Sequence, residues 1–278
     1  MIANQDKRHF DLTFASDHTG RTFLHRQFVR YPFHVCRGLY LNAHDGGACS
    51  VALQSTSGGL FEADATVGRI AAGLGARAQV NTSAATIAHA MHAADASQRV
   101  DVEADAGSVV VYAPQPLILF PHSAVRSSID IQAHADASVI VSESFLTHDP
   151  NAGEDCFRMW DSRLTLRSNK GELLAQDRQL LTGKEWLASS LGVSNALHAY
   201  ANVWIIQRTG LRELLAAARS LLDAAQVYGG ASLLPHATGI HVRMLCRDGV
   251  ELKKCMTTLL DLAQCGTRRA QHESMASA

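Results

Sequence analysis

Two carboxylates that follow a pair of glycines form the stretch with the clearest capacity for chemistry. Glu62 and Asp64 come directly after Gly58-Gly59-Leu60-Phe61. Because two glycines allow a tight turn, we expect both acids to share one face of the strand that follows. Carboxylate oxygens suit hard or borderline divalent cations, so the pair is a candidate for binding a metal ion in passage. An ordinary polar turn would have the same composition.

Histidine is the second source of candidate ligands, since the chain contains 14 copies and imidazole suits nickel and zinc. His89 and His92 stand three residues apart, which puts them on one face of a helix but on opposite faces of a strand. We expect a strand here, and no third or fourth ligand stands nearby. The pair is therefore a weak metal candidate. A metal-dependent hydrolase that uses both histidines and an acid is an alternative hypothesis.

Motifs of the common catalytic folds are missing from the sequence. It contains no GxSxG nucleophile elbow, no P-loop, no GxGxxG and no HExxH. Without a P-loop the chain is not expected to be a GTPase of the usual kind, and any nucleotide chemistry would have to come from a partner. The formal net charge is −1 and the basic residues are scattered, which argues against a nucleic-acid partner.

The N-terminus and the cysteines indicate a cytoplasmic protein. No apolar segment typical of a signal peptide follows Met1, and no apolar run is long enough to span a bilayer. The six cysteines are widely spaced and include no CxxC pair. Because a reducing compartment keeps such thiols free, we expect a soluble cytoplasmic protein without disulfides and without a membrane partner.

Short strands dominate the region from about residue 20 to 180, where apolar and polar residues alternate between turns. Three turns of small residues begin at Gly73, Ala104 and Ala135, which are 31 residues apart each time. A strand is expected before and after each turn. Equal spacing of one unit predicts stacked β-layers, in a helicoid or solenoid-like body. A meander of similar strands with chance spacing is the alternative.

The C-terminal part changes character. Apolar residues at helical spacing predict a helix over Leu211–Val227, ended by Gly229-Gly230, and a second helix over Val250–Cys265. Between them, Ile240–Leu245 is typical of a strand, and the polar tail 266–278 is expected to fray. These elements predict a mainly β protein with two C-terminal helices.

No segment is rich enough in Pro, Gly or Ser to act as a linker between independent units. We therefore expect a single domain over residues 1–278. Its β body is expected at about 18–208, and its part with two helices and a strand at about 209–265.

Several motifs carry a resemblance to a known family. Ser57–Asp64 resembles the Gly-Gly-Leu-Leu-x-Gly-Asp signature of the UreD (also UreH) family of urease accessory proteins. Other segments resemble further pieces of that family in the same order: Asn81–Thr86, Ala96–Gln98, Pro114–Phe120, Gly153–Phe157 and Gly230–Leu234. The resemblance covers roughly residues 18–265.

Departures from the family pattern fall mostly on polar positions. Ala63 stands where the signature has the glycine before its aspartate. Ser83 replaces the usual Gln, Ile87 the usual Lys and Val111 the usual Glu. The resemblance is therefore to a divergent member, in which a metal path or a partner surface that uses these positions would be altered.

The resemblance implies a urease maturation factor that is not itself an enzyme and has no tightly bound cofactor. Members bind UreF, which recruits the GTPase UreG, and the assembly docks on apo-urease for GTP-dependent nickel insertion. Nickel(II) would then be a transient cargo, and the positions expected along its passage are Glu62, Asp64, Thr82, Ser83 and Glu154. A conduit needs weak oxygen ligands in series, because a closed site would trap the ion. A pure interaction scaffold with no metal path is the alternative.

The apolar stripes of the two predicted helices are candidate partner surfaces, because such stripes dock in grooves. The residues expected to contribute are Leu211, Leu214, Leu215, Leu222 and Leu259. The competing interpretation is that these side chains simply cover the β body.

Overall fold

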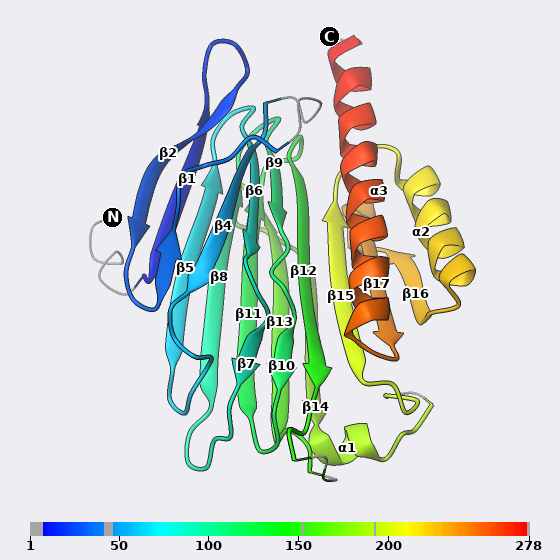
Figure 1. Cartoon of the computed structure of the whole chain (residues 1–278). Coiled ribbons are helices and arrows are strands. Elements are labelled where there is room, and N and C mark those ends of the chain that lie inside the picture. The colour runs from blue at the N-terminus through cyan, green and yellow to red at the C-terminus, as the bar shows by residue number, and fades with distance from the viewer. Residues whose placement is uncertain (1–7, 42–46, 152, 154, 192, 277–278) are drawn as a thin grey trace.

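Two β-sheets and a pair of helices form three layers in this protein. The computed structural model describes residues 8–41, 47–151, 153, 155–191 and 193–276, with side chains as far as residue 266. One sheet has seven strands and the other has ten. Figure 1 shows the two sheets face to face, with the two long helices on one side of the molecule. The fold is mainly β, as the sequence predicts.

The seven-stranded sheet has the order β14-β13-β11-β8-β5-β1-β2. Its strands are β1 (Phe10–Ser16), β2 (Thr22–Val29), β5 (Ala65–Ala72), β8 (Ala96–Ala104), β11 (Ala124–Ala133), β13 (Met159–Ser168) and β14 (Leu173–Thr182).

The ten-stranded sheet has the order β16-β17-β15-β12-β9-β6-β4-β3, and two short strands, β7 and β10, pair with each other beside β12. Its strands are β3 (Phe33–Val35), β4 (Cys49–Ser55), β6 (Arg77–Thr82), β7 (Thr86–Ala88), β9 (Val109–Tyr112), β10 (Leu117–Leu119), β12 (Ser138–Thr147), β15 (Ala199–Ile206), β16 (Tyr228–Leu233) and β17 (Gly239–Cys246). The helices are α1 (Gly183–Leu187), α2 (Leu211–Ala225) and α3 (Gly249–Ala276), and a 3₁₀ turn lies at Pro235–Ala237.

The 31-residue spacing corresponds to stacked layers. Each of the three predicted turns joins a strand of one sheet to a strand of the other: β5 to β6, β8 to β9 and β11 to β12. Successive layers pair in parallel within each sheet. The result is a β-solenoid of about four turns, which confirms the predicted helicoid. The parallel pairing excludes the simple meander, because strands joined by tight turns within one sheet would be antiparallel.

A ladder of apolar side chains runs between the sheets and shows why the layers stack. Leu12, Ile70, Val102, Ile131 and Leu166 are register neighbours on β1, β5, β8, β11 and β13. Each of the five is almost fully buried. Because a strand turns alternate side chains to opposite faces, the inward residues meet the facing sheet while the outward ones stay polar. Burial of each such side chain favours folding by about 1.5–3 kcal/mol.

Aromatic residues close one end of the space between the sheets. Phe145 on β12 lies with its ring centroid 5.0–5.8 Å from those of Phe157, Trp160, Trp186 and Tyr200. The short helix α1 supplies Trp186, and Thr182 and Glu185 form a capping box at its start. The apolar pattern of the sequence does not predict this five-residue helix.

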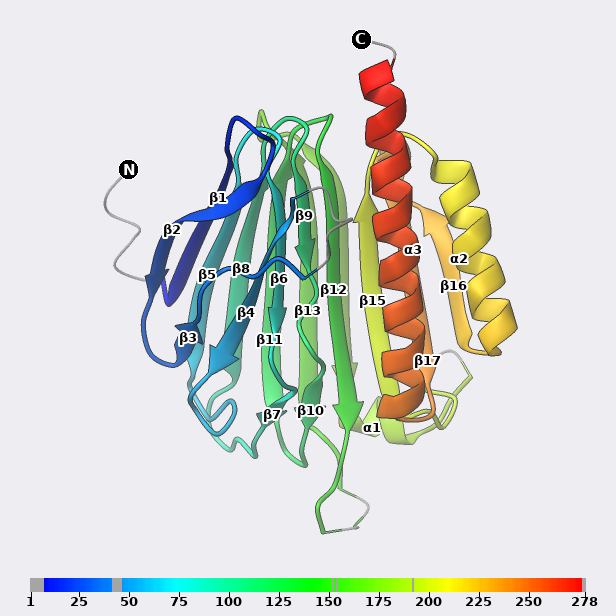
Figure 2. The same cartoon turned by 45° about the horizontal axis from the view of Figure 1, so that its top comes forward.

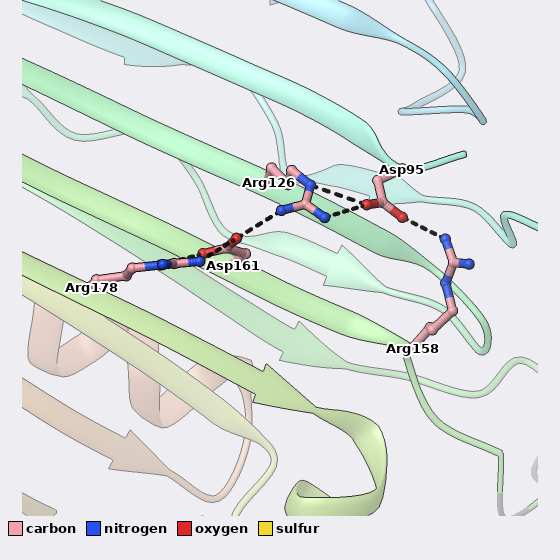
Figure 3. A network of polar contacts seen from close by, with 5 residues as sticks. All are labelled: Asp95, Arg126, Arg158, Asp161 and Arg178. Atoms are coloured by element: carbon pink, nitrogen blue, oxygen red, sulfur yellow. Dashed lines mark hydrogen bonds and ion pairs between the residues drawn. The ribbon is translucent and has the colours of Figure 1, made fainter. Parts of the chain in front are cut away.

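The outer face of the seven-stranded sheet is held by alternating charges (Figure 3). Arg126 on β11 pairs with Asp95 and with Asp161 on β13, each at 2.9 Å. Arg178 on β14 binds Asp161 from the other side at 3.3 Å, and Arg158 binds Asp95 at 2.6 Å. The charges join neighbouring layers and keep this face polar, so it needs no cover from another part of the chain.

The outer face of the ten-stranded sheet is covered by α2 and α3, which lie side by side over β15 to β17 (Figures 1 and 2). Leu214, Ala218 and Leu222 of α2 are buried against the sheet, as are Leu252 and Leu259 of α3. Their spacing of three, four and seven residues is that of one helix face. Neither described helix is long and apolar enough to serve as a membrane span.

The ends of the two helices differ from the prediction. α2 ends at Ala225, where Gln226 adopts a left-handed conformation with φ 53°. Gly229-Gly230 does not end the helix but lies in β16, where a Cβ at Gly229 would stand 2.6 Å from the Arg243 carbonyl oxygen. α3 continues past Cys265 to Ala276, and its last turns extend beyond the ends of the sheets (Figure 2).

Replacing Phe145 with Ala is expected to lower the free energy of unfolding by about 3–5 kcal/mol, because it empties the centre of the aromatic cluster. The matched variant Phe28→Ala removes the same atoms from a side chain that is 40% exposed, and should cost less than about 1 kcal/mol. Urea denaturation of both variants measures the difference. Equal losses would contradict the packing described for Phe145.

Candidate functional site

The turn at residues 58–64 joins two layers of the solenoid. The Leu60 N–H donates to the Ile87 carbonyl at 2.7 Å, and the His89 N–H donates to the Leu60 carbonyl at 3.0 Å. Gly59 has φ 143°, and a Cβ there would stand 2.3 Å from the Ile87 carbonyl oxygen. Glycine is therefore required at this point by both conformation and space.

Glu62 holds the loop of the next layer. Its Oε2 accepts the His92 N–H at 2.9 Å, and its Oε1 accepts the N–H groups of Ala93 and Ala94 at 3.0 and 3.2 Å. These three hydrogen bonds keep the pKa of the Glu62 carboxyl below its usual range, and the bond from the His92 N–H has the largest effect. Both oxygens are thus engaged by backbone donors on the protein surface.

Asp64 stabilises the turn itself. Its Oδ2 accepts the Phe61 N–H at 2.8 Å, and its own N–H donates to the Phe61 carbonyl at 3.1 Å. The prediction that Glu62 and Asp64 share a strand face is wrong, because both precede β5, which begins at Ala65. Ala63 lies between them with φ 65°, the left-handed conformation that glycine adopts without strain.

His89 and His92 do not lie in a strand as expected, because β7 ends at Ala88 and β8 begins at Ala96. The His89 ring stacks on Phe61 with centroids 4.5 Å apart, and its Nε2 lies 3.1 Å from the Gly58 carbonyl oxygen. Within the ranges that the structure describes, no group of three or more His, Cys, Asp or Glu side chains could hold a metal ion. Glu154, another predicted ligand, lies outside the described residues.

Thr82 and Ser83 line a cavity of about 480 Å³ between the sheets. The cavity lies where the ten-stranded sheet is interrupted: β6 ends at Thr82 before β7 begins, and β9 ends at Tyr112 before β10 begins. The intervening segments at 83–85 and 113–116 leave the sheet. Thr82 Oγ1 accepts the Gln115 N–H at 2.8 Å and so joins these two segments.

A buried carboxylate lies inside this cavity. Glu143 on β12 is 5% exposed, and its two oxygens accept the hydroxyls of Ser127 at 2.7 Å and Ser162 at 2.5 Å. Burial raises the pKa of Glu143 to about 6, against the opposing effect of the two serine hydrogen bonds, while Asp177 raises it further. Both hydrogen-bond donors to this carboxylate are neutral hydroxyl groups.

A row of polar side chains crosses the inner face of the seven-stranded sheet at the level of Glu143. Each member is the register partner of the next on the neighbouring strand. The row consists of Thr66, Gln98, Ser127, Ser162 and Gln179. These polar residues interrupt an otherwise apolar interior. Because burying an unpaired polar group costs free energy, apolar residues would be expected at these positions if packing alone decided them.

The facing sheet carries a matching row. Glu143, Asn202 and Arg243 are register partners on β12, β15 and β17. Asp177 of β14 accepts a hydrogen bond from the Asn202 amide at 3.2 Å and pairs with Arg243 at 2.9 Å. The two sheets are therefore joined by polar contacts from Glu143 as far as Arg243.

The matching rows end at a second cavity of about 310 Å³, between the edge strands β14 and β16. Gln179, Tyr200 and Arg243 line it. The Tyr200 hydroxyl donates to Gln179 Oε1 across the two sheets. Polar side chains thus extend from the lining of the first cavity to the lining of the second. At the second end, the Tyr200–Gln179 hydrogen bond and the Arg243–Asp177 ion pair join the two sheets.

Four of the five positions predicted along the nickel passage are described, and they fall into two groups. Thr82 and Ser83 line the first cavity, whereas Glu62 and Asp64 do not belong to its lining. Sequence reasoning missed Glu143, although one signal was available: it is the only charged residue in the stretch Val139–Leu146, where five of the eight residues are apolar. A charge there must either be paired or have a function.

The five leucines proposed for partner binding mostly pack inside the protein. Leu214, Leu222 and Leu259 are at most 5% exposed, and Leu211 and Leu215 pack partly against the same cluster. In this fold the buried ones can support a partner surface only by holding α2 and α3 in place.

Comparison with known proteins identifies the family. The model of the UreD urease accessory protein family matches residues 7–276. The chain belongs to the UreD family. Urease accessory protein UreD 1 of Pseudomonas syringae pv. syringae (strain B728a) is 34% identical over 254 residues, which cover 91% of this chain and 89% of that protein. UreD 1 of Bradyrhizobium sp. (strain BTAi1 / ATCC BAA-1182) is 31% identical over 247 residues, which cover 89% and 87%.

Membership in the UreD family confirms the resemblance found in the sequence. Members are urease accessory proteins that assist urease maturation and are not catalytic. The hypothesis of a metal-dependent hydrolase is therefore wrong, and the chain is a maturation factor. Identities of 29–34% to the relatives agree with the divergence seen at Ala63 and Ser83.

Replacing Ala63 with Gly is expected to raise the free energy of unfolding by about 0.5–1 kcal/mol, because it relieves a left-handed conformation that disfavours a Cβ. The control Ala106→Gly lies in another turn of small residues but outside the left-handed region, and should destabilise slightly. Chemical denaturation compares the two. A loss of stability in Ala63→Gly would contradict the strain.

Replacing Glu143 with Gln is expected to remove a pH dependence of stability. Because the folded protein raises this pKa from 4.5 to about 6, it holds the proton more tightly than the unfolded chain. The contribution to stability is full below pH 4.5 and is lost as the pH rises through about 6, with a total of about 2 kcal/mol.

Denaturation at pH 4.5 and pH 7.5 measures this contribution in the wild type, Glu143→Gln and the surface control Glu213→Gln. Between pH 4.5 and pH 7.5, the free energy of unfolding of the wild type and of the control should fall by about 2 kcal/mol more than that of Glu143→Gln. Identical losses in all three proteins would show that Glu143 is not buried as described.

Proposed function

We propose that this chain acts in the cytoplasm with UreF and the GTPase UreG on apo-urease, and that nickel(II) crosses it between the two sheets during GTP-dependent insertion. Family membership supports the maturation role. The observation that carries the path is Glu143, a buried carboxylate that lines the first cavity and belongs to a polar row reaching the second.

Electrostatics favour a cation beside Glu143. Moving a carboxylate out of water is costly, and its raised pKa reports that cost. A divalent cation next to the ionised group would offset the cost, so the interior attracts nickel(II) even though it lacks a closed site. The Trp160 Nε1–H is buried, finds no hydrogen-bond partner among the described residues, and belongs to a residue that lines the same cavity.

The ligands along this path are weak and succeed one another, as a conduit requires. Ser83 is exposed at the break in the ten-stranded sheet beside Thr82, and Glu143 lies between the sheets. Asp177 follows through its ion pair with Arg243, which lines the second cavity, and nickel(II) would compete with Arg243 for this carboxylate. Hydroxyl and single carboxylate oxygens bind a cation without enclosing it, whereas four protein ligands would retain it. Nickel is thus cargo and not a resident cofactor.

The other predicted positions have supporting roles in this proposal. Glu62 and Asp64 hold the turn that brings Gly58 and Gly59 to the cavity. Glu154 stays a predicted ligand. Partner contacts of the helices are assigned to the partly exposed Leu211 and Leu215 of α2, while the buried Leu214, Leu222 and Leu259 hold α2 and α3 in place.

Reconstituted activation tests the path. Apo-urease, UreF, UreG, GTP and nickel(II) are combined with the wild type, Glu143→Gln or Glu213→Gln, and urease activity and bound nickel are measured. Glu143→Gln is expected to lower both at least fivefold while the complex still forms, because the amide carries no charge. Glu213→Gln, on the exposed face of α2, should match the wild type.

Full activation by Glu143→Gln, in a complex of normal composition, would contradict the nickel path. The alternative of a pure interaction scaffold would then be preferred. Failure of the wild type to associate with UreF and apo-urease would contradict the maturation role as a whole.

A further inference from the structure

One segment of the chain combines basic and aromatic residues without any acid. Residues 18–41 contain four arginines and three histidines but no Asp or Glu, in a chain of net charge −1. The arginines are Arg21, Arg26, Arg30 and Arg37, and all four are exposed. This part of the surface is therefore more positive than the chain as a whole.

The same segment exposes large apolar side chains. Six of those with substantial exposure lie here: Phe23, Phe28, Tyr31, Leu39, Tyr40 and Leu41, from 38% to 73% exposed. Exposed apolar groups that gather on one part of a protein mark interaction sites more often than isolated ones do. Aromatic residues and arginine are also the types enriched in the energetic centres of protein interfaces.

The segment forms the end of the solenoid that lies away from the long helices (Figure 1). β2 is the last strand of the seven-stranded sheet, and β3 is the last strand of the ten-stranded sheet. β2 has eight residues. Its residues Gln27 and Val29 pair with Leu12 and Phe10, whose side chains point inward. The alternate residues Arg26 and Phe28 therefore point outward. A long edge strand with exposed apolar groups is a liability unless another surface covers it.

Local contacts hold this surface in shape. The Arg21 guanidinium lies 3.9 Å from the centre of the Tyr40 ring, and the Tyr40 hydroxyl donates to the Thr22 carbonyl at 2.9 Å. The Leu39 backbone pairs with Ser50 of β4. The loop after β3 is thus fixed against β2, and a partner would lose little conformational entropy in binding it.

We propose that this basic aromatic end, residues 21–41, docks on an acidic surface of a protein partner in the maturation assembly. The inference rests on the proposed function only in that the chain works within a protein complex. Acidic side chains on the partner would complement the four arginines, and apolar groups would cover Phe28 and Tyr31. The charge balance of the whole chain lacks the basic excess of a nucleic-acid binder.

Charge reversal within the full chain tests the docking surface. The variant Arg26→Glu with Arg37→Glu is compared with Lys253→Glu with Lys254→Glu, an equal change of charge at exposed positions of α3. Binding of each purified chain to UreF and to apo-urease is measured at low and high salt. The first variant should lose at least tenfold affinity for one partner and much of the salt dependence, and the α3 control should stay within twofold.

A third variant separates the apolar contribution from charge. Tyr31→Ser changes a side chain that is 73% exposed, so folding should be unaffected, and affinity for the same partner should fall at least fivefold. Wild-type affinity in both the charge and Tyr31 variants, or binding of the wild type to a DNA duplex in place of either protein, would overturn the proposal. Binding is read without nickel, so a failed nickel path leaves this test intact.

Discussion

Parallel stacking of successive layers is the constraint on which the rest of the structure depends. Leu12, Ile70, Val102, Ile131 and Leu166 lie one above another between the sheets, each provided by a different layer. Since each layer buries its apolar face only against its neighbours, any side chain at one level of the repeat is placed next to its equivalents above and below. A polar residue at that level therefore becomes part of a row.

The same geometry that builds the core also builds the polar path. Ser127 and Ser162 lie side by side because β11 and β13 pair in parallel, and together they hold the two oxygens of Glu143. A lone buried carboxylate would be destabilising. Its retention here, in a cavity that begins at a break in one sheet, is best understood as a functional feature that the apolar ladder stabilises.

The sequence allowed the layers to be predicted but not the interior. Alternation of apolar and polar residues is a local property, so the strands around Gly73, Ala104 and Ala135 could be recognised together with their 31-residue spacing. Glu143 was missed because its neighbours across the two sheets, Ser162 and Asp177, lie far along the chain. Glu62 was predicted as a ligand, yet its oxygens bind the backbone of residues 92–94, a contact that only the tertiary structure reveals.

The central claim is that nickel(II) enters the space between the sheets and lies beside Glu143. Anomalous diffraction at the nickel absorption edge, from crystals of the chain soaked in nickel(II), tests it most directly. The account predicts a peak within coordination distance of a Glu143 carboxylate oxygen, inside the cavity lined by Thr82 and Ser83. Peaks confined to surface histidines such as His25 and His34, with none between the sheets, would contradict it.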